Sequence, residues 1–199
     1  MTHVTEERAL EEKAVVERKT LGFWIYLMTD CVLFAALFAT FIVLRNATAG
    51  GPSGNELFDM PFVLVETMIL LTSSFTVGMA LLAAERGFKK QTLIWLAVTF
   101  SLGVAFLFME ISEFNALVAE GAGWQRSAFL SSFFTLVATH GLHIAIGLLW
   151  MVVVAVRLWR FKFKKTDLNR LALLGLFWHF LDIVWIFIFT IVYLIGGMA

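Results

Sequence analysis

Long apolar segments separated by short polar ones dominate the pattern of this chain. A helix that crosses the roughly 30 Å hydrocarbon layer of a bilayer needs about 20 mostly apolar residues, and it satisfies its own backbone hydrogen bonds there. Five segments meet this requirement: residues 21–44, 61–84, 92–114, 128–156 and 171–195. The pattern therefore predicts an all-α integral membrane protein, a bundle of five transmembrane helices that forms one domain over residues 21–199.

Polar segments at the start of the chain and between the spans complete this picture. Residues 1–20 are polar and charged, and they contain no apolar stretch followed by a cleavage site of the signal-peptide type. We expect them to form a polar cytoplasmic tail, with residues 6–19 as a short surface helix or a mobile segment. Pro61 falls at the first turn of the second span, where proline is tolerated.

Composition supports the membrane assignment and narrows the classes of partner. Hydrophobic residues make up 60% of the 199 residues and charged residues only 15%, whereas about a quarter of a soluble domain is charged. The formal net charge of zero gives no indication of a nucleic-acid partner. The single cysteine, Cys31, excludes an intrachain disulfide, and within its apolar run it is expected to be a small buried hydrophobic residue.

The distribution of Lys and Arg predicts how the chain is oriented in the membrane. Thirteen of the 15 basic residues lie in the N-terminal tail and in the second and fourth connections, which alternate onto one side of the bilayer. Cytoplasmic segments of membrane proteins carry such an excess of basic residues. We therefore expect a cytoplasmic N-terminus and a C-terminus outside.

Eight ionisable residues lie within the predicted spans, where an ionisable side chain costs about 2.5–3.5 kcal/mol unless it has a partner or a purpose. They are Asp30, Glu66, Glu110, Glu113, His140, His143, His179 and Asp182. No Lys or Arg lies in the interior of a span, so we expect some of the carboxyl groups to be protonated or paired with histidine.

Spacing and depth sort these residues into groups. Three pairs have i,i+3 spacing, which predicts that the two members of each point into one neighbourhood: Glu110 with Glu113, His140 with His143, and His179 with Asp182. At a rise of about 1.5 Å per residue, Asp30 and the two histidine-containing pairs lie near the midplane. Glu66 and Glu110 both lie about 10 Å towards the outer face, and Glu113 lies further out. The sequence thus predicts one polar layer at the midplane and one outer pair of carboxyl groups.

Three functions fit this pattern. The polar side chains could form interhelical hydrogen bonds that lock the bundle, a proton or ion pathway, or a metal site, because His, Asp and Glu ligate iron, copper and zinc. The bulky neighbours Trp178, Phe180 and Trp185 argue against an open coordination position at the last pair. Small residues in the second and fourth spans indicate close packing of helices: Thr72, Ser73, Ser74, Gly141 and Gly147.

Three motifs make the chain similar to a known family, subunit III of the haem–copper oxidases. Residues 177–187 resemble the last helix of that family, residues 139–143 its His-Gly-x-His helix, and residues 112–114 its Ser-Glu-aromatic helix end. The resemblance covers nearly the whole chain from Leu21 onward. The five spans, with residues 22–28 and 48–52, are most similar to the five-helix form of bacterial cytochrome bo-type ubiquinol oxidases.

This resemblance implies a non-catalytic subunit of a proton-pumping quinol oxidase, which reduces oxygen to water in the aerobic respiratory chain of the bacterial inner membrane. It implies no catalytic residue and no metal in this chain, structural histidines, and haem and copper in the partner subunit I. It also implies contact with subunit I, assembly with subunit II and a small subunit IV, phospholipid binding, support of sustained proton uptake, and a periplasmic C-terminus. Asp30 aligns with an intramembrane carboxyl that is usually glutamate in the family, and Arg157 with a basic residue at a lipid headgroup site.

The alternative from another class is a small ion or proton transporter that uses the same buried carboxyl groups. Five spans without an internal repeat or a broken apolar segment argue against the inverted-repeat plan of many transporters. A transporter would purify as a colourless chain, whereas a subunit of an oxidase would purify together with haem.

Overall fold

The computed structural model of the chain describes residues 2–52, 54–161 and 165–196, and helices dominate these residues. Five helices are long and apolar enough to cross a membrane. In chain order the elements are α1 (Thr2–Leu44), the single turn α2 (Gly54–Leu57), α3 (Met60–Glu85), α4 (Lys89–Ala119), α5 (Ala128–Arg160), α6 (Lys165–Ile188) and the π-helix η1 (Phe189–Ile195). The described residues contain no strand, so the predicted all-helical class with five membrane-spanning helices is confirmed.

Local side-chain chemistry fixes where the central helices begin. The carboxyl of Asp59 accepts a hydrogen bond from the backbone N–H of Phe62 at the start of α3, and Pro61 occupies the first turn as expected. The Ser127 hydroxyl accepts a hydrogen bond of 3.1 Å from the backbone N–H of Leu130, which caps α5. Between α3 and α4 the chain turns sharply at Gly87, whose φ of 77° favours glycine.

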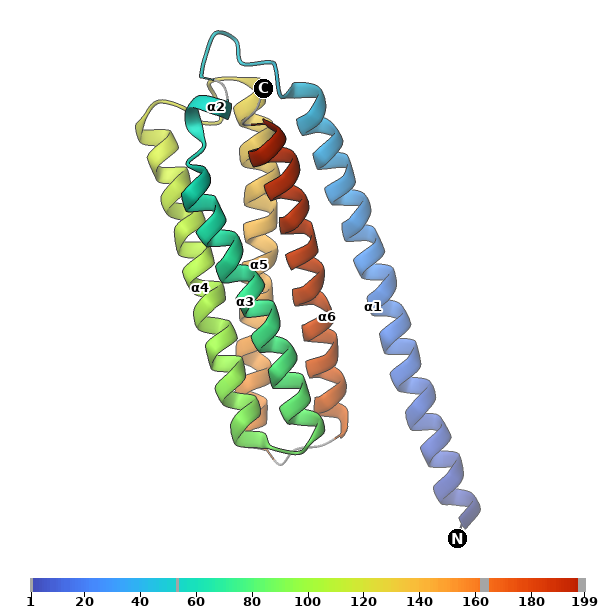
Figure 1. Cartoon of the computed structure of the whole chain (residues 1–199). Coiled ribbons are helices and arrows are strands. Elements are labelled where there is room, and N and C mark those ends of the chain that lie inside the picture. The colour runs from blue at the N-terminus through green and yellow to red at the C-terminus, as the bar shows by residue number, and fades with distance from the viewer. Residues whose placement is uncertain (1, 53, 162–164, 197–199) are drawn as a thin grey trace.

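Four of the long helices form a closed bundle, and α1 lies outside it. Helix α3 packs against α4 and α6, and α5 completes the ring by packing against the same two neighbours. Helix α1 packs mainly along α5 and α6, and Figure 1 shows it at the edge of the bundle, diverging from the other helices towards its N-terminal end. The N-terminal end of α1 and the end of η1 lie at opposite ends of the molecule (Figure 1), as an odd number of spans requires.

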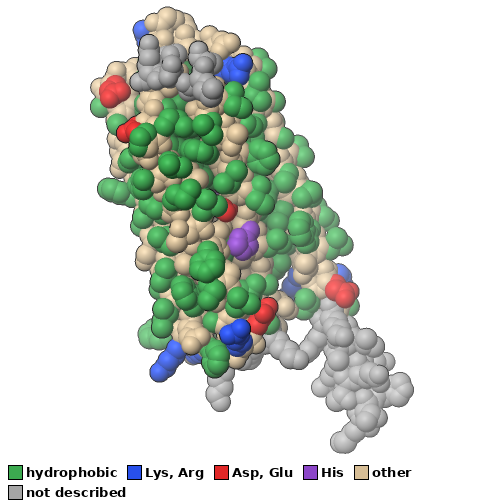
Figure 2. Space-filling view, in the orientation of Figure 1, with side chains coloured by type: hydrophobic (Ala, Val, Ile, Leu, Met, Phe, Trp, Pro, Cys, Tyr) green, Lys and Arg blue, Asp and Glu red, His purple; other side chains and the backbone are tan. Residues whose placement is uncertain are grey.

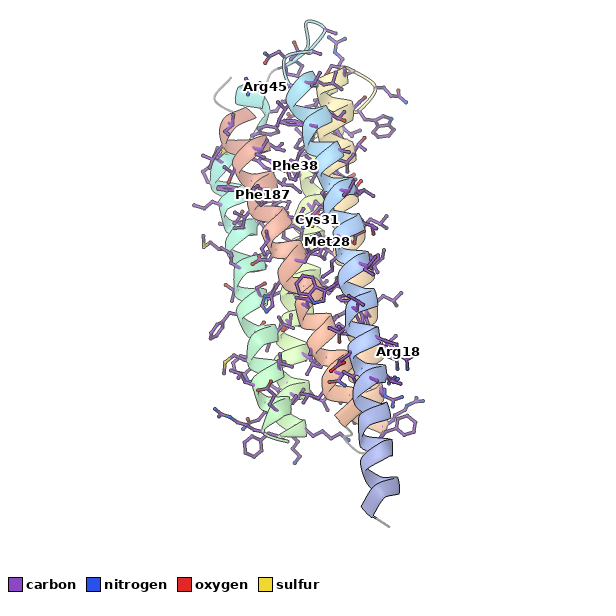
Figure 3. The ribbon with its side chains drawn as sticks, turned by 90° about the vertical axis from the view of Figure 1, so that its right-hand side faces the viewer. Arg18, Met28, Cys31, Phe38, Arg45 and Phe187 are labelled. Carbon is purple, nitrogen blue, oxygen red and sulfur yellow. The ribbon has the colours of Figure 1, made fainter. Side chains whose placement is uncertain are left out.

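Helix α1 differs from the sequence prediction in two respects. The polar segment expected to be a separate surface helix or a mobile tail continues into the first span as one helix. Cys31 is exposed on α1, so the expectation that it is buried was wrong. Figure 3 shows Cys31 and Met28 on the outer helix, while Phe38 of α1 packs against Phe187 of α6 with ring centroids 6.3 Å apart. The position of α1 at the edge of the bundle explains this exposure.

Small residues admit large aromatic side chains into the bundle. An added Cβ at Gly147 would lie 3.0 Å from the indole of Trp178, and one at Gly103 would lie 2.9 Å from the same ring. Trp178 therefore fills space that two glycines on α4 and α5 leave open. Ser73 is buried as expected, but Thr72 is exposed and its hydroxyl donates to the carbonyl of Met68 in its own helix. The prediction of close packing at Thr72 was wrong.

Candidate functional site

Hydroxyl groups of α3 bond side chains of α6 along the line where these two helices pack. The bonds, or contacts within bonding distance, are Trp178 Nε1 to Ser73 Oγ at 2.9 Å, His179 Nδ1 to Ser74 Oγ at 3.3 Å, and Trp185 Nε1 to Thr67 Oγ1 at 3.0 Å. The two indole N–H groups donate, because an indole nitrogen cannot accept. Asp182 lies close enough to Ser74 and to His179 for its carboxyl group to interact electrostatically with both, so the predicted pair of His179 and Asp182 shares one neighbourhood.

His140 is fully buried between α4, α5 and α6. Its Nε2 lies 3.2 Å from the backbone carbonyl of Leu181, and since a carbonyl only accepts, Nε2 carries the proton. The imidazole lies against the ring of Trp185 with centroids 5.1 Å apart, and the ring of Phe106 is roughly perpendicular to it with centroids 5.7 Å apart. Aromatic rings enclose the imidazole and a backbone carbonyl orients it.

His143 faces a different helix and pairs with Asp30 of α1. The His143 Nδ1 donates to the carbonyl of Thr139 at 2.7 Å, which directs Nε2 towards the Asp30 carboxyl, whose Oδ2 is 3.7 Å away. The separation exceeds a direct hydrogen bond, so the contact is electrostatic in this geometry. Because Nδ1 already carries the proton that it donates to Thr139, a second proton at this contact can lie either on His143 Nε2 or on the Asp30 carboxyl.

The two histidines of α5 do not share a neighbourhood, contrary to the expectation from their i,i+3 spacing. His140 contacts α4 and α6, whereas His143 contacts Asp30 and Phe34 of α1. Positions three residues apart differ by about 60° around a helix, and on a helix surrounded by neighbours that angle separates one contact from the next. The spacing places residues on one face without fixing which helix that face meets.

The outer carboxyl groups form a cluster of three. Glu66 of α3 and Glu110 and Glu113 of α4 lie close enough to interact electrostatically, so the predicted pair includes the third acid. The carboxyl of Glu110 presses against Gly141 of α5, where an added Cβ would overlap Oε1. The hydroxyl of the buried Tyr193 donates to Glu113 Oε2 at 2.9 Å. The i,i+3 prediction is met for these two acids, and Tyr193 is a contributor that sequence analysis did not identify.

Protein partners satisfy this carboxyl cluster only in part. Both carboxyl oxygens of Glu66 and Oε2 of Glu110 are buried without a hydrogen-bond partner among the described residues. The ion pairs among residues 2–52, 54–161 and 165–196 involve other side chains. No basic side chain of these residues therefore neutralises the cluster. Burying several carboxylates together without such partners would cost several kcal/mol for each. Protonation would remove this cost, as expected from the sequence for some of the buried carboxyl groups.

The potential metal ligands of the described residues lie in separate contacts. Within the described residues no group of three or more His, Cys, Asp and Glu side chains is placed to hold a metal ion. The histidines are divided among separate contacts: His140 with Leu181, His143 with Asp30, and His179 with Ser74. The eight ionisable residues of the spans thus form several small polar contacts.

Arg157 lies in the last turn of α5 and is tied to the start of α6. Its Nε donates to Asp167 Oδ1 at 2.6 Å, and Arg170 Nη1 approaches the same oxygen at 3.7 Å. Asp167 is buried, while 37% of the Arg157 side chain is exposed. Nearby, Lys89 donates from Nζ to the carbonyls of Trp159 and Phe161 at 3.2 and 3.0 Å, where the helix dipole of α5 is negative. Asp167 was missed from sequence because it stands alone in a basic run, of which residues 162–164 lie outside the described part of the chain.

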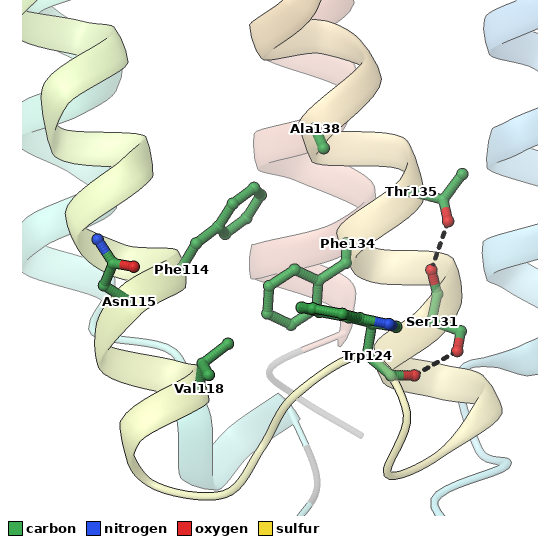
Figure 4. Close-up of a pocket in the computed structure, with 8 residues that line it drawn as sticks. All are labelled: Phe114, Asn115, Val118, Trp124, Ser131, Phe134, Thr135 and Ala138. Carbon is green, nitrogen blue, oxygen red and sulfur yellow. Dashed lines mark hydrogen bonds between the residues drawn. The ribbon is translucent and has the colours of Figure 1, made fainter.

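A shallow pocket of about 480 Å³ lies at the opposite end of the bundle, where α4 ends and α5 begins. Ser131 donates to the carbonyl of Trp124 and Thr135 to that of Ser131, so these hydroxyl groups are used within the chain (Figure 4). The lining residues are Phe114, Asn115, Val118, Trp124, Ser131, Phe134, Thr135 and Ala138. None of the eight ionisable residues lines this pocket, so it is separate from the polar contacts of the bundle.

Comparison with known proteins shows the family to which this chain belongs. The family model for cytochrome c oxidase subunit III matches residues 4–197. The chain is 60% identical over 177 residues to the cytochrome bo(3) ubiquinol oxidase subunit 3 of Pseudomonas aeruginosa, covering 89% of this chain and 85% of the relative. It is 47% identical over 176 residues to the quinol oxidase subunit 3 of Bacillus subtilis, covering 88% and 86%. It is 45% identical over 198 residues to the cytochrome c oxidase subunit 3 of Bacillus sp. strain PS3, covering 98% and 96%.

Proposed function

We propose, on the basis that this chain belongs to the cytochrome c oxidase subunit III family, that it is the non-catalytic third subunit of a quinol oxidase. The observation that carries the proposal is 60% identity, over most of both chains, to a protein named as a ubiquinol oxidase subunit. The haem and copper of such a complex would reside in subunit I, and this chain would contact subunit I and assemble with subunit II and a small subunit IV. Its location would be a bacterial inner membrane.

The buried polar contacts support a structural and proton-related role for the eight ionisable residues. Hydrogen bonds in lipid are a principal means of holding helices together, because apolar side chains gain little by leaving apolar surroundings. The bonds of Ser73, Ser74 and Thr67 connect α3 to α6, and Tyr193 connects η1 to α4. The carboxyl cluster retains acceptor sites that the described chain leaves unused, which suits a store of exchangeable protons. Arg157, whose side chain is 37% exposed, remains a proposed contact for a phospholipid headgroup.

The transporter alternative has no support from these comparisons. The relatives are named as oxidase subunits, and the family model that matches nearly the whole chain is that of an oxidase subunit. The buried acids that suggested a transporter lie in contacts between helices.

Purification through a tag on this chain tests the proposed function directly. Membranes solubilised in mild detergent should yield the tagged chain together with haem absorbance, with quinol-dependent oxygen consumption, and with larger subunits. A parallel preparation from cells that carry the untagged chain controls for nonspecific recovery of haem. Recovery of the chain as a colourless single polypeptide would contradict the proposal.

The orientation of the chain can be measured independently. Because 13 of 15 basic residues fall in segments assigned to one side, a tag after Ala199 should be accessible from outside the inner membrane, whereas a tag before Met1 should be protected. Spheroplasts treated with an impermeant protease provide the measurement, and lysed spheroplasts provide the control in which both tags are cut. Protection of the C-terminal tag with cleavage of the N-terminal tag would reverse the orientation.

Substitution of Asp30 separates a supporting role from a catalytic one. Asn at position 30 keeps the size and hydrogen-bonding capacity that face His143, so we expect oxygen consumption to persist with a modest loss of durability during turnover. Leu at position 30 leaves the His143 Nε2 without a polar partner, at a cost of about 1–3 kcal/mol, and should loosen α1 from α5. The measurements are quinol-dependent oxygen uptake and retention of this chain through purification.

The matched control for Asp30 is Thr40→Val on the same helix. Thr40 is exposed and its hydroxyl bonds only to the carbonyl of Ala36, so this change should leave both measurements unaltered. If an Asp30→Asn complex assembles with normal haem content but consumes no oxygen, the carboxyl is required for catalysis and the supporting role is excluded.

A further inference from the structure

A histidine on the outside of the bundle lies at the middle of a membrane span. The fifth span covers Thr166–Ile195, and His179 stands within about 3 Å of its centre at the helical rise of 1.5 Å per residue. Unlike His140 and His143, which are buried, His179 is exposed. Figure 2 shows a histidine near the middle of this view of the molecule, with an acidic side chain close to it and hydrophobic side chains over much of the face around them.

The polar atoms of His179 are only partly used by this chain. Its Nδ1 lies 3.3 Å from Ser74 Oγ, and its Nε2 has no hydrogen-bond partner among the described residues. Asp182 lies one turn away and is half-buried. Its Oδ1 is buried and has no hydrogen-bond partner among the residues that the structure describes. Ionisable groups at this depth almost always face a bundle interior or a water-filled cavity, because lipid offers them no partner. An exposed imidazole here therefore indicates a protein surface that faces another protein.

Two glycines lie beside His179: Gly78 of α3, which is partly buried, and Gly175 of α6, which is buried. Gly78 follows Ser74 by four residues on α3, and Gly175 precedes His179 by four residues on α6. Since α3 and α6 are antiparallel and Ser74 meets His179, the two glycines lie at one level, one turn further along. An added Cβ at either glycine would meet nothing within 4 Å. Small residues at such positions let transmembrane helices approach closely, and here they adjoin a free hydrogen-bonding group.

We propose that this face, defined by Gly78 of α3 and by Gly175, His179 and Ile183 of α6, docks a transmembrane helix of another oxidase subunit, which bonds His179 Nε2. The partner helix supplies a hydrogen-bonding side chain or an exposed carbonyl at mid-membrane depth and packs over the two glycines. This inference rests on the proposed function, because it requires that the chain assemble with other subunits. It assigns the surface and the chemistry of the contact, which membership of the family leaves open.

Retention of haem by the purified chain measures the contact. Leu in place of His179 should lower the haem retained per chain after detergent washing by about fivefold, equivalent to about 1 kcal/mol. Gln in place of His179 restores an amide donor and acceptor and should recover most of the loss. Thr72→Val is the matched control, because Thr72 is an exposed polar residue of α3 whose hydroxyl bonds only within its helix. That variant should retain haem as the unsubstituted chain does.

Photo-crosslinking identifies what covers the face. A photoreactive phenylalanine derivative that replaces Ile183, which is 57% exposed and one turn from His179, should crosslink in intact membranes to another oxidase subunit. Crosslinks only to lipid, crosslinks to a second copy of this chain, or full haem retention in His179→Leu would each overturn the inference. Equal losses in His179→Leu and His179→Gln would exclude the hydrogen bond. In all of these outcomes, haem that purifies with the unsubstituted chain still supports the proposed function.

Discussion

Alanine in place of Trp178 should lower the free energy of unfolding by about 3–5 kcal/mol, the range for removing a large aromatic side chain from a packed core. The indole is 1% exposed and donates to Ser73 at 2.9 Å. It also occupies the space above Gly103 and Gly147, so its removal leaves a void that three helices border. Because the bundle gains little from apolar burial in lipid, loss of these contacts is not compensated by collapse.

Thermal dissociation of the purified complex in detergent provides the measurement for Trp178. Phe at position 178 keeps part of the ring volume but removes the donor to Ser73. The dissociation temperature of the Trp178→Phe complex should therefore lie between those of the Trp178→Ala and unsubstituted complexes. Trp159→Ala is the control, because that side chain is 71% exposed and an exposed substitution usually changes stability by less than about 0.5 kcal/mol. If the Trp178→Ala complex dissociates at the same temperature as the unsubstituted complex, neighbouring side chains fill the void and the expected loss of stability is contradicted.

Adding a methyl group at Gly141 should destabilise the bundle by about 1–3 kcal/mol, because overpacking forces neighbouring groups from their positions. The new Cβ would overlap Glu110 Oε1 and lie 2.9 Å from the carboxyl carbon. Glu110 is 2% exposed and belongs to the cluster with Glu66 and Glu113, so it cannot move towards water. The cost of Gly141→Ala thus arises from displacement of a buried acid.

A double-mutant cycle tests this cause. Glu110→Ala removes the group that the new methyl meets, so Gly141→Ala should cost much less in that background than in the native one. Gly22→Ala on α1 is the matched control, because nothing lies within 4 Å of its added Cβ and alanine favours a helix by about 0.5–1 kcal/mol over glycine. Thermal dissociation and steady-state level in the membrane report the effect. An additive cycle would show that the two residues are not coupled.

The polar groups were located from sequence more completely than their contacts. Ionisable side chains in apolar runs are visible in any sequence, and Asp30, Glu66 and His179 were identified in this way. Thr67 and Tyr193 were not identified, because a threonine or tyrosine in a span is common and its hydroxyl usually bonds within its own helix. Only the packing of α6 and η1 shows that these two hydroxyl groups bond Trp185 and Glu113. The π-helix that carries Tyr193 likewise had no signal in the sequence.

The sequence by itself determined the number of spans, their approximate limits and the helical class. These depend on local quantities, since a window of about 20 apolar residues decides whether a segment partitions into lipid as a helix. It also determined which acids and histidines would be within the spans. The position of Pro61 in the first turn of its helix follows from an equally local backbone preference.

Only the tertiary structure decided which side chains meet. His140 and His143 contact different helices, Glu113 joins Glu66 and Glu110, and Cys31 and His179 are exposed. Each outcome depends on how a helix is rotated about its axis and which neighbours surround it. In lipid the hydrophobic effect does not set that rotation, so it is fixed by close packing at glycines and by interhelical hydrogen bonds, which involve residues more than 100 positions apart, such as Ser73 and Trp178.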